Sequence, residues 1–190
     1  HPQHRRQRQM CIRDRYFTDQ GNWKVFVNYK IKNISKDNFK NYGDLITTSN
    51  KNYESINKDT TDSFFDLANI QIIGDDKRSR LNIFQAKKRN FPLKINMLEN
   101  HPFSSQVFLP FNATGFLVLV APIGNKPKID LIEIFKVSGG DGINFNPKVW
   151  HFPLISLENE KYITIDKKDA DNNIEIYNFE QSEIFELNYE

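Results

Sequence analysis

Cysteine and histidine are scarce in this chain, and their scarcity limits the chemistry that it can perform. The 190 residues include one cysteine and four histidines. One cysteine cannot form an internal disulfide or a cysteine-rich zinc site. Two of the histidines lie within the first four residues, so a side chain that titrates near neutral pH is otherwise available only at His101 and His151.

Long apolar segments are also missing. The longest apolar run, Phe116–Ala121, is far shorter than the ~18 residues that a membrane-spanning helix requires. The N-terminal residues show no signal-peptide pattern. The sequence therefore predicts a soluble, cytoplasmic protein with no membrane partner.

The first 15 residues differ in character from the rest of the chain. Residues 5–14 (RRQRQMCIRD) resemble a translated sequencing-library adapter, so we expect residues 1–15 to be an adapter-derived artefact and exclude them from fold reasoning. The alternative is a basic arm that binds nucleic acid. Residues 16–27 are an uncertain N-terminal extension, because no plausible start methionine lies between Met10 and Met97.

This exclusion reverses the sign of the net charge. Residues 1–15 hold five arginines and one aspartate, and without them the formal charge moves from +2 to −2. Cys11 leaves with them, so the remaining chain has no cysteine. The main argument for a nucleic-acid partner disappears, and we expect none.

The remaining chain, residues 28–190, has the length of a single domain. Residues 35–43 predict a short helix, with Ser35 as N-cap and Gly43 just past its end. Short apolar or alternating segments separated by turn residues then predict strands at residues 45–48, 70–73, 81–86, 93–98, 107–109, 116–121, 149–155, 162–165 and 174–177.

Many short strands at roughly ten-residue spacing predict a mainly β fold, either a sandwich or a barrel. Residues 116–121 lack polar alternation, so we expect both faces of that strand to be buried. Residues 49–63 predict a long loop or lid, and residues 139–142 (GGDG) a turn. Residues 130–137 are compatible with a helical turn or with a further strand.

The first histidine lies in a segment with other polar groups. Glu99 and His101 are two residues apart, so in a strand they share a face. Gln106 follows on the next predicted strand. These three side chains could bind a divalent cation or a small polar substrate. The alternative is an exposed His-Pro turn with a solvated glutamate.

The second histidine lies among large aromatic residues and prolines. Pro147 predicts a turn, Trp150 supplies a rigid wall, and His151 is expected to begin the following strand. A tightly held imidazole suits general acid–base catalysis. The alternative is a core histidine bonded to the backbone. A later run of charges, residues 166–169 (DKKD), is typical of a solvated turn.

Five ordered pieces of the chain show a family resemblance. They are Phe39–Ile46, similar to F-x-x-Y-G-D-V-I; Leu98–Pro110, similar to L-E-R-H-P-x-G/S-S/T-Q-x-F-I/L-P; the apolar strand Phe116–Ala121; Gly142–Leu154, similar to G-V-N-Y-H-x-x-x-W-H-H-P-L; and Ile163–Lys167, similar to x-T-I-D-R. From about Asn33 to its C-terminus the chain resembles the ureidoglycolate lyase family, formerly called ureidoglycolate hydrolases.

The resemblance implies a cupin-like double-stranded β-helix barrel with a few short helices. It implies a carbon–nitrogen lyase of the amidine-lyase type that cleaves (S)-ureidoglycolate to glyoxylate and urea during allantoin and purine catabolism. A divalent metal, Ni or Mn, and a homodimer are implied as well, with no organic cofactor.

Matching motif positions implies a set of site residues. His151 is the expected acid or base, and Lys167 is expected to pair with the substrate carboxylate. The complete sets are His151, Glu99 and His101 for catalysis; Gln106, Asn144, Asn146 and Lys167 for substrate binding; and His101, Gln106 and Glu99 for a metal.

The chain departs from the family pattern at three positions. Asn146 and Phe152 stand where histidines are common, and neither can transfer a proton near pH 7. Gln85 stands where an arginine is common, which removes a bidentate carboxylate clamp. Two alternatives follow: a non-catalytic module that binds small carboxylates, or a related enzyme that acts on another small hydroxy acid.

Overall fold

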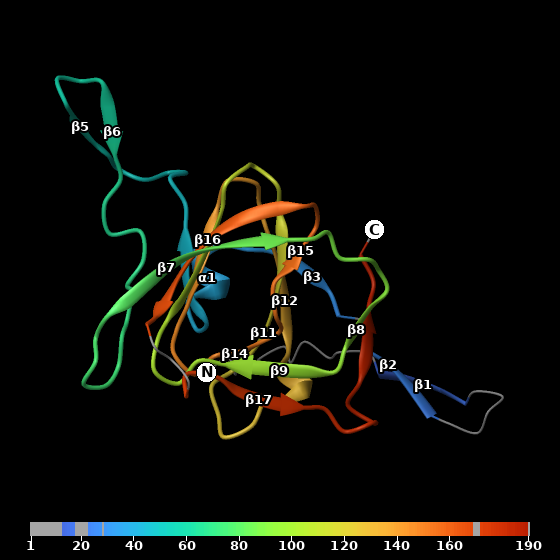
Figure 1. The fold of residues 1–190 in the computed structure, drawn as a ribbon. Helices are drawn as coiled ribbons and strands as arrows, with labels where there is room; N and C mark the ends of the chain where they lie inside the picture. The colour runs from blue at the N-terminus through green and yellow to red at the C-terminus, as the bar shows by residue number, and fades with distance from the viewer. Residues whose placement is uncertain (1–12, 18–22, 28, 169–171, 190) are drawn as a thin grey trace, which may run out of the picture.

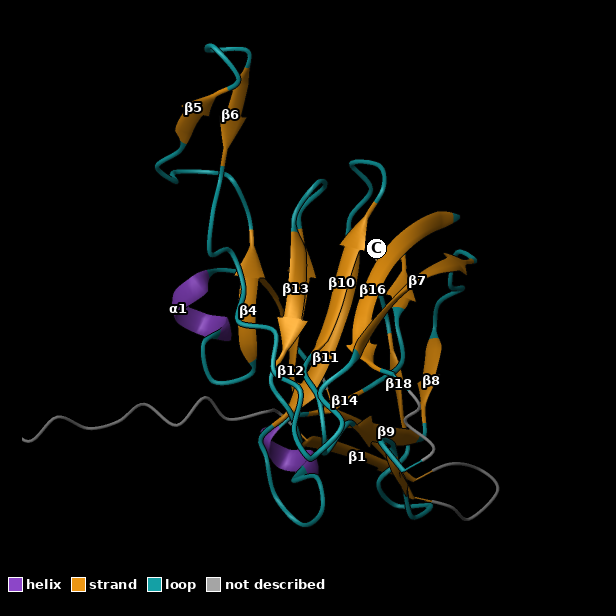
Figure 2. Cartoon of the chain, turned by 60° about the vertical axis from the view of Figure 1, so that its left-hand side comes forward, coloured by secondary structure: helices purple, strands orange, loops and turns teal. Residues whose placement is uncertain are grey.

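Two β-sheets form the body of the protein in the computed structural model, which describes residues 13–17, 23–27, 29–168 and 172–189 (Figure 1). The five-stranded sheet has the order β4 (Gly43–Ile46), β13 (Gly142–Phe145), β10 (Gln106–Pro110), β16 (Glu160–Lys167) and β7 (Ser79–Ala86), and Figure 2 shows these strands side by side.

The seven-stranded sheet contains the other chain segments that matter for the site. Its order is β17 (Glu175–Asn178), β9 (Met97–Asn100), β14 (Trp150–His151), β11 (Phe116–Ala121), β12 (Glu133–Val137) and β3 (Ile31–Asn33), with β15 (Ile155–Ser156) also paired to β11. Only the β12–β3 pair of this sheet is parallel among the described strands.

Smaller elements complete the described chain. Three two-stranded sheets join β1 (Arg13–Phe17) to β2 (Trp23–Val27), β5 (Glu54–Ile56) to β6 (Thr61–Ser63), and β8 (Leu93–Ile95) to β18 (Phe185–Leu187). The helical segments are α1 (Lys36–Phe39) and the 3-10 helix η1 (Ile129–Leu131). Each described helix is too short to span a bilayer.

Strand β11 lies between two hydrophobic clusters. Its odd and even positions contribute to different clusters, so both faces are buried, as its unbroken apolar sequence predicts. One cluster fills the space between the two sheets, where the rings of Phe116 and Tyr162 meet edge to face with centroids 5.4 Å apart. The other lies between the seven-stranded sheet and the β8–β18 pair. The predicted mainly β, barrel-like fold is confirmed.

Several predicted boundaries are wrong for local reasons. The helix ends at Phe39, and Gly43 begins β4 instead of capping the helix. The predicted strand at residues 93–98 divides at Asn96 into β8 and β9, which pair with different sheets. The strand predicted at residues 149–155 is also interrupted, because Pro153 lies between β14 and β15.

The structure also settles the secondary structure of the segments that the sequence left open or assigned to loops and turns. Residues 130–137 contain both alternatives, a 3-10 turn followed by β12. Residues 49–63 are not a plain loop, because they include the β5–β6 hairpin, which projects from the body (Figure 1). Residues 70–73 form only an isolated bridge between Ile72 and Ser104. The predicted turn at residues 139–142 is confirmed at residues 139–140, but Gly142 already begins β13.

The N-terminal artefact prediction falls mainly outside the described residues. Of residues 1–15, the structure describes only 13–15, whose backbone belongs to β1 and pairs with β2. The assignment of residues 1–15 as non-native therefore stays a prediction.

Candidate active site

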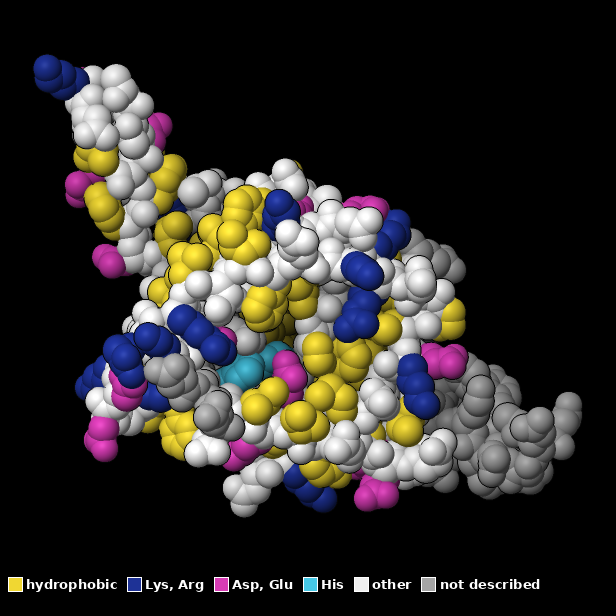
Figure 3. All heavy atoms as spheres, in the orientation of Figure 1, with side chains coloured by type: hydrophobic (Ala, Val, Ile, Leu, Met, Phe, Trp, Pro, Cys, Tyr) yellow, Lys and Arg dark blue, Asp and Glu magenta, His cyan; other side chains and the backbone are white. Residues whose placement is uncertain are grey.

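Glu99, His101 and His151 converge where β9 and β14 pair. Glu99 lies directly opposite His151 in the ladder, and His101 follows the end of β9. One potential ligand atom from each residue lies within 4.8 Å of the others, and His151 Nε2 is 3.7 Å from Glu99 Oε1. Figure 3 shows histidine side chains beside an acidic one at the base of a hollow on this face. The predicted Glu99–His101 pairing on one face thus brings both residues to His151.

In both histidines Nδ1 is bound to a backbone carbonyl, and Nε2 is the nitrogen without a partner. Nδ1 of His101 lies 2.6 Å from the Asn173 carbonyl oxygen, and Nδ1 of His151 lies 2.9 Å from the Val149 carbonyl oxygen. A carbonyl can only accept, so each Nδ1 carries the hydrogen when the ring is neutral. Each Nε2 then holds a lone pair, and both Nε2 atoms are buried without a hydrogen-bond partner.

Burial disfavours the charged forms of His151 and Glu99. The pKa of His151 is lowered to about 3, mainly because burial disfavours the charged ring; the positive charge that His101 can carry adds to this lowering, and the Val149 carbonyl opposes it. Burial likewise raises the pKa of Glu99, against the opposing charge of His101. The ring of His151 also stacks on Phe145, with centroids 4.3 Å apart. His151 is therefore neutral at physiological pH, which departs from the expectation that it titrates near neutrality.

The donor set fits a divalent transition metal. Two imidazole nitrogens with free lone pairs and one carboxylate are common ligands of such ions. The carbonyls that hold each Nδ1–H fix the ring orientation, as outer partners of metal-bound histidines do. The predicted metal set was His101, Gln106 and Glu99. The structure instead groups His151 with Glu99 and His101.

Gln106 faces the same interior from the opposite sheet. It pairs with Phe145, the residue that stacks on His151, and its Oε1 atom is buried without a hydrogen-bond partner. The backbone of Gln106 is therefore about one strand spacing, ~5 Å, from that of Phe145, whose ring supports the histidine cluster. An unpartnered amide oxygen in this position can accept from a substrate N–H or coordinate a cation.

Three predicted substrate-binding residues are not brought to this cluster. Asn144 faces away from it, since the neighbouring Ile143 and Phe145 face the interior, and its Nδ2 donates to Asp44 Oδ2 and to the Asn69 carbonyl. Asn146 lies in the turn after β13, where its backbone N–H donates to the Tyr42 carbonyl.

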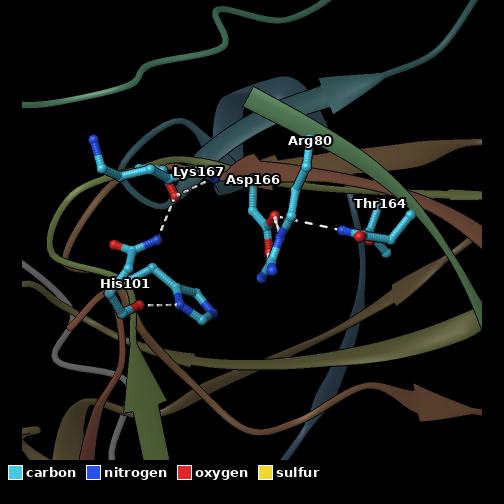
Figure 4. A network of polar contacts seen from close by, with 8 residues as sticks. Arg80, His101, Thr164, Asp166 and Lys167 are labelled. Atoms are coloured by element: carbon cyan, nitrogen blue, oxygen red, sulfur yellow. Dashed lines mark hydrogen bonds and ion pairs between the residues drawn. The ribbon is translucent and has the colours of Figure 1, made fainter. Parts of the chain in front are cut away.

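Lys167 is directed to a loop beside the pocket. Its Nζ donates to the carbonyls of Ile73, at 3.0 Å, and of Asp76. Figure 4 shows its side chain leading away from His101. Asn144 and Lys167 thus share one structural task, because both fasten the segment between residues 69 and 76.

The two remaining departures from the family pattern, Phe152 and Gln85, differ in burial. Phe152 is buried and borders a small apolar cavity together with Phe108, Val118 and Phe145. Gln85 is exposed on β7, opposite Lys161 on the outer face of the five-stranded sheet.

Sequence reasoning missed four residues: Phe145 and Asn173, which contact the histidines, and Arg80 and Asp166, which pair with each other between β7 and β16. The prediction that Asp166 lies in a solvated turn is wrong, because it is in β16, is 5% exposed and forms an ion pair with Arg80. The signal was the alternation of Thr164 and Asp166 with apolar neighbours, which places both side chains on one face. No comparable signal marks Asn173, which acts through its backbone carbonyl.

A barrel-like β fold in which two imidazoles, a carboxylate and an amide converge on one hollow defines a small-molecule site of the metal-binding or acid–base type. Comparison with known proteins is more specific. The model of the ureidoglycolate lyase family matches residues 27–186, and the chain belongs to this family.

Relatives from several pseudomonads support the same assignment. The chain is 34% identical to a ureidoglycolate lyase of Pseudomonas aeruginosa (strain LESB58) over 155 residues, which are 81% of this chain and 92% of the relative. It is 31% identical to a ureidoglycolate lyase of Pseudomonas putida (strain GB-1) over 159 residues, 83% of this chain and 95% of the relative. The region that the family model matches, residues 27–186, contains the whole candidate site.

Proposed function

We propose that this protein is a ureidoglycolate lyase that cleaves (S)-ureidoglycolate to glyoxylate and urea. The observation that supports this most directly is the convergence of Glu99, His101 and His151 within the matched family region. The reaction requires a base, a proton donor and polar groups that bind a small, highly polar substrate, and this hollow supplies all of these types.

The reaction is an elimination across the carbinol carbon. A base removes the proton from the carbinol oxygen, the oxygen lone pair forms the carbonyl of glyoxylate, and the C–N bond breaks. The electron pair of that bond goes to the departing urea nitrogen, which is then protonated. The proton lost from oxygen equals the proton gained by nitrogen, so one carboxyl group can perform both transfers.

We assign this proton transfer to Glu99. Its side chain is 18% exposed and lies 3.7 Å from His151, so it is accessible from the hollow yet fixed beside the imidazoles. The two histidines, each oriented by a backbone carbonyl, would bind and orient the substrate or hold a metal. Gln106 would accept from the ureido N–H groups through its unpartnered oxygen.

His101, His151 and Glu99, with Gln106 beside them, are the residues that would hold a divalent metal such as Ni²⁺ or Mn²⁺. Such an ion would supply Lewis-acid polarisation of an oxygen ligand. The remaining predicted binders, Asn144 and Lys167, would contribute indirectly by fastening the 69–76 segment.

A related enzyme for another small hydroxy acid is the second candidate. The departures from the family pattern at Asn146, Phe152 and Gln85 motivate this candidate, while the cluster itself is retained. A module that binds carboxylates without turnover would share the same cluster. These alternatives predict binding of small acids but no release of urea from ureidoglycolate.

Turnover by purified protein separates these possibilities. Metal-stripped protein and protein loaded with Ni²⁺ or Mn²⁺ should be incubated with (S)-ureidoglycolate while urea and glyoxylate are quantified. We expect release above the uncatalysed rate, and a drop in kcat of roughly 10²-fold or more for His151→Ala and for Glu99→Gln. Glu158→Gln, which alters an exposed carboxylate paired with Lys88, is the matched control.

Release of urea at the background rate by every metal form would contradict the proposed activity. An unchanged kcat in Glu99→Gln would contradict the assigned role of Glu99 but not the activity. We further propose that the native domain comprises residues 28–190, that it acts in the cytoplasm and that it forms a homodimer.

A further inference from the structure

The two imidazoles of the cluster are held in different ways. The carbonyl that binds Nδ1 of His151, at 2.9 Å, belongs to Val149, two residues earlier in the chain. The carbonyl that binds Nδ1 of His101, at 2.6 Å, belongs to Asn173, which is 72 residues away in the sequence (Figure 4). The orientation of the His151 ring therefore depends on local backbone geometry, whereas that of the His101 ring depends on tertiary structure.

The pairing of β17 with β9 brings Asn173 to His101. Glu175 lies opposite Asn100 in this antiparallel ladder, so the chain just before Glu175 runs beside the loop that follows β9. Asn100 Nδ2 also donates to Glu175 Oε2 at 2.9 Å, which fastens the end of the ladder. Strand register thus places Asn173 next to residues 101–104.

The side chain of Asn173 is bound to the loop that carries His101. Its Oδ1 accepts from the Phe103 backbone N–H at 2.7 Å, and its Nδ2 donates to Ser104 Oγ at 2.8 Å. Asn173 is 3% exposed and Ser104 is 1% exposed, so water competes little for the bond between them. Together with its carbonyl, Asn173 binds His101, Phe103 and Ser104, all in the one loop.

Ser104 is itself fixed by other parts of the chain. The Lys167 backbone N–H donates to Ser104 Oγ at 3.3 Å, and Ser104 forms a β-bridge with Ile72. The amide of Asn173 is therefore attached to a part of the loop that is held independently. Because the amide and the carbonyl belong to one residue, the two amide bonds determine where the carbonyl lies relative to the His101 ring.

The position of this carbonyl decides which nitrogen of His101 can act in the site. A neutral imidazole carries one N–H, and the hydrogen bond made by one nitrogen determines the state of the other. An unconstrained histidine in water favours Nε2–H, but the Asn173 carbonyl requires Nδ1–H, which leaves the lone pair on Nε2. In the opposite tautomer Nε2 would be a donor and could neither accept from a substrate N–H nor bind a cation.

We infer that Asn173 is a positioning residue of the active site, whose backbone carbonyl and side-chain amide together hold His101 in the Nδ1–H tautomer. The effect of Asn173 on turnover rests on the proposed function, whereas its effect on the His101 ring does not. The inference adds a role for the side chain of Asn173, which touches neither Glu99 nor His151 through any described hydrogen bond and acts only through the loop that carries His101.

The test measures the tautomer directly. Nitrogen-15 spectra of the full chain, labelled at histidine and recorded without metal at alkaline pH, distinguish a ring nitrogen that carries hydrogen from one that holds a lone pair. Spectra of His101→Gln and His151→Gln assign the two rings. In wild type, both rings should show Nδ1–H.

Asn173→Ala should change one ring and not the other. The ratio of Nε2–H to Nδ1–H at His101 should rise at least ~5-fold, the equivalent of about one hydrogen bond. His151 should keep its tautomer, because Val149 still holds its Nδ1–H. Asn173→Asp, which can still accept from the Phe103 N–H, should lie between wild type and Asn173→Ala.

Turnover should follow the same order. We expect kcat to fall roughly 10-fold or more in Asn173→Ala and less in Asn173→Asp, as for other residues that orient a site histidine. The control is Asn112→Ala, which removes an amide that fastens a different loop through a 2.9 Å bond to Glu160 Oε1. It should leave both imidazoles and kcat as in wild type.

A wild-type tautomer ratio at His101 in Asn173→Ala would overturn the inference. An equal change at His151 would also overturn it, because a general loosening of the site would affect both rings. If Asn173→Ala does not fold, Ser104→Ala removes the partner of the amide and should shift His101 in the same direction. A tautomer that depends on Asn173, in a protein that releases no urea from ureidoglycolate, would refute the lyase activity and leave the positioning role standing.

Discussion

Phe152 shows how one side chain next to the site can belong to the core instead. It follows His151 directly, yet it packs with the hydrophobic cluster behind the seven-stranded sheet and is 9% exposed. Its backbone N–H donates to the Leu119 carbonyl, which keeps residue 152 registered against β11. The family resemblance alone would count this phenylalanine as a lost proton carrier, whereas its surroundings are those of a packing residue.

Restoring a histidine at this position should therefore not restore activity. We expect Phe152→His to lower the free energy of unfolding by roughly 1–3 kcal/mol, since it buries a polar ring among apolar side chains, and to leave kcat unchanged or reduced. Denaturant unfolding and steady-state kinetics on the same preparation measure both effects. A clear rise in kcat would instead place residue 152 within reach of the substrate.

At the scale of elements, strand β4 depends on one glycine for its approach to β13. Gly43 has a φ of +153°, and a Cβ at this position would lie 1.9 Å from the backbone oxygen of Asn144. The neighbouring backbone cannot move aside without separating the two strands, and β13 carries Phe145 beneath His151. A residue with a side chain at position 43 would thus disturb both the sheet and the support of the site.

Gly43→Ala should be far more damaging than a glycine substitution that meets only backbone strain. Gly140, with a φ of +88° and no atom within 4 Å of an added Cβ, is the matched comparison. We expect Gly140→Ala to cost about 1–2 kcal/mol and Gly43→Ala clearly more. Thermal or denaturant unfolding of both variants tests this, and equal costs would show that the close approach to Asn144 is easily relieved.

Glu160 joins the start of β16 to the loop that follows β10. Burial by itself raises the pKa of this carboxyl, but donors from Thr114, the Lys161 backbone and Asn112 outweigh burial, and the pKa lies below its usual value. A carboxyl with a lower pKa in the folded state binds fewer protons than in the unfolded state. Its contribution to stability is present above the unfolded pKa and is lost as the pH falls through the folded pKa.

Removing this carboxylate should flatten the acid side of the stability profile. Between pH 7 and pH 3, Glu160→Gln should start less stable than wild type and lose less stability as the pH falls. Glu158→Gln, an exposed glutamate two residues earlier, should keep the wild-type slope. Denaturant midpoints measured across this range decide the matter, and parallel profiles for wild type and Glu160→Gln would refute it.

At the scale of the whole molecule, the outer face of the five-stranded sheet is unusually apolar for solvent. Leu81 and Ile83 on the edge strand β7 are exposed, and they lie opposite the partly exposed Ile165 and Ile163 of β16. Exposed apolar side chains on an edge strand invite pairing with another sheet. This face is the surface through which we expect the proposed homodimer to form.

A charge on this face should dissociate the dimer. Ile83→Asp is expected to yield monomers, whereas Ile123→Asp, at a residue 56% exposed in a loop elsewhere, should leave the dimer intact. Light scattering after size-exclusion chromatography at several concentrations gives the mass directly. A dimeric Ile83→Asp would move the interface to another surface, and a monomeric wild type would refute the homodimer.

Much of the fold and part of the site follow from local pattern. The apolar run at residues 116–121 predicts its own burial, and the two-residue spacing of Glu99 and His101 predicts their shared face. Asn144 and Lys167, by contrast, match motif positions, but they bind loop carbonyls at residues 69–76, and Asn144 also binds Asp44 of β4. A motif shows that a residue type is present at a position and not which atoms surround it.

The sequence by itself determined that the chain is mainly β, that its credible histidines are His101 and His151, and which family it resembles, because strand periodicity and short motifs are local properties. Only the tertiary structure decided which face of each strand is interior. The pairing of β9 with β14 brought His151 to Glu99, and the pairing of β16 with β7 turned Arg80 and Asp166 inward. Strand register joins residues far apart in the chain, and one residue of slip would exchange every interior side chain for an exterior one.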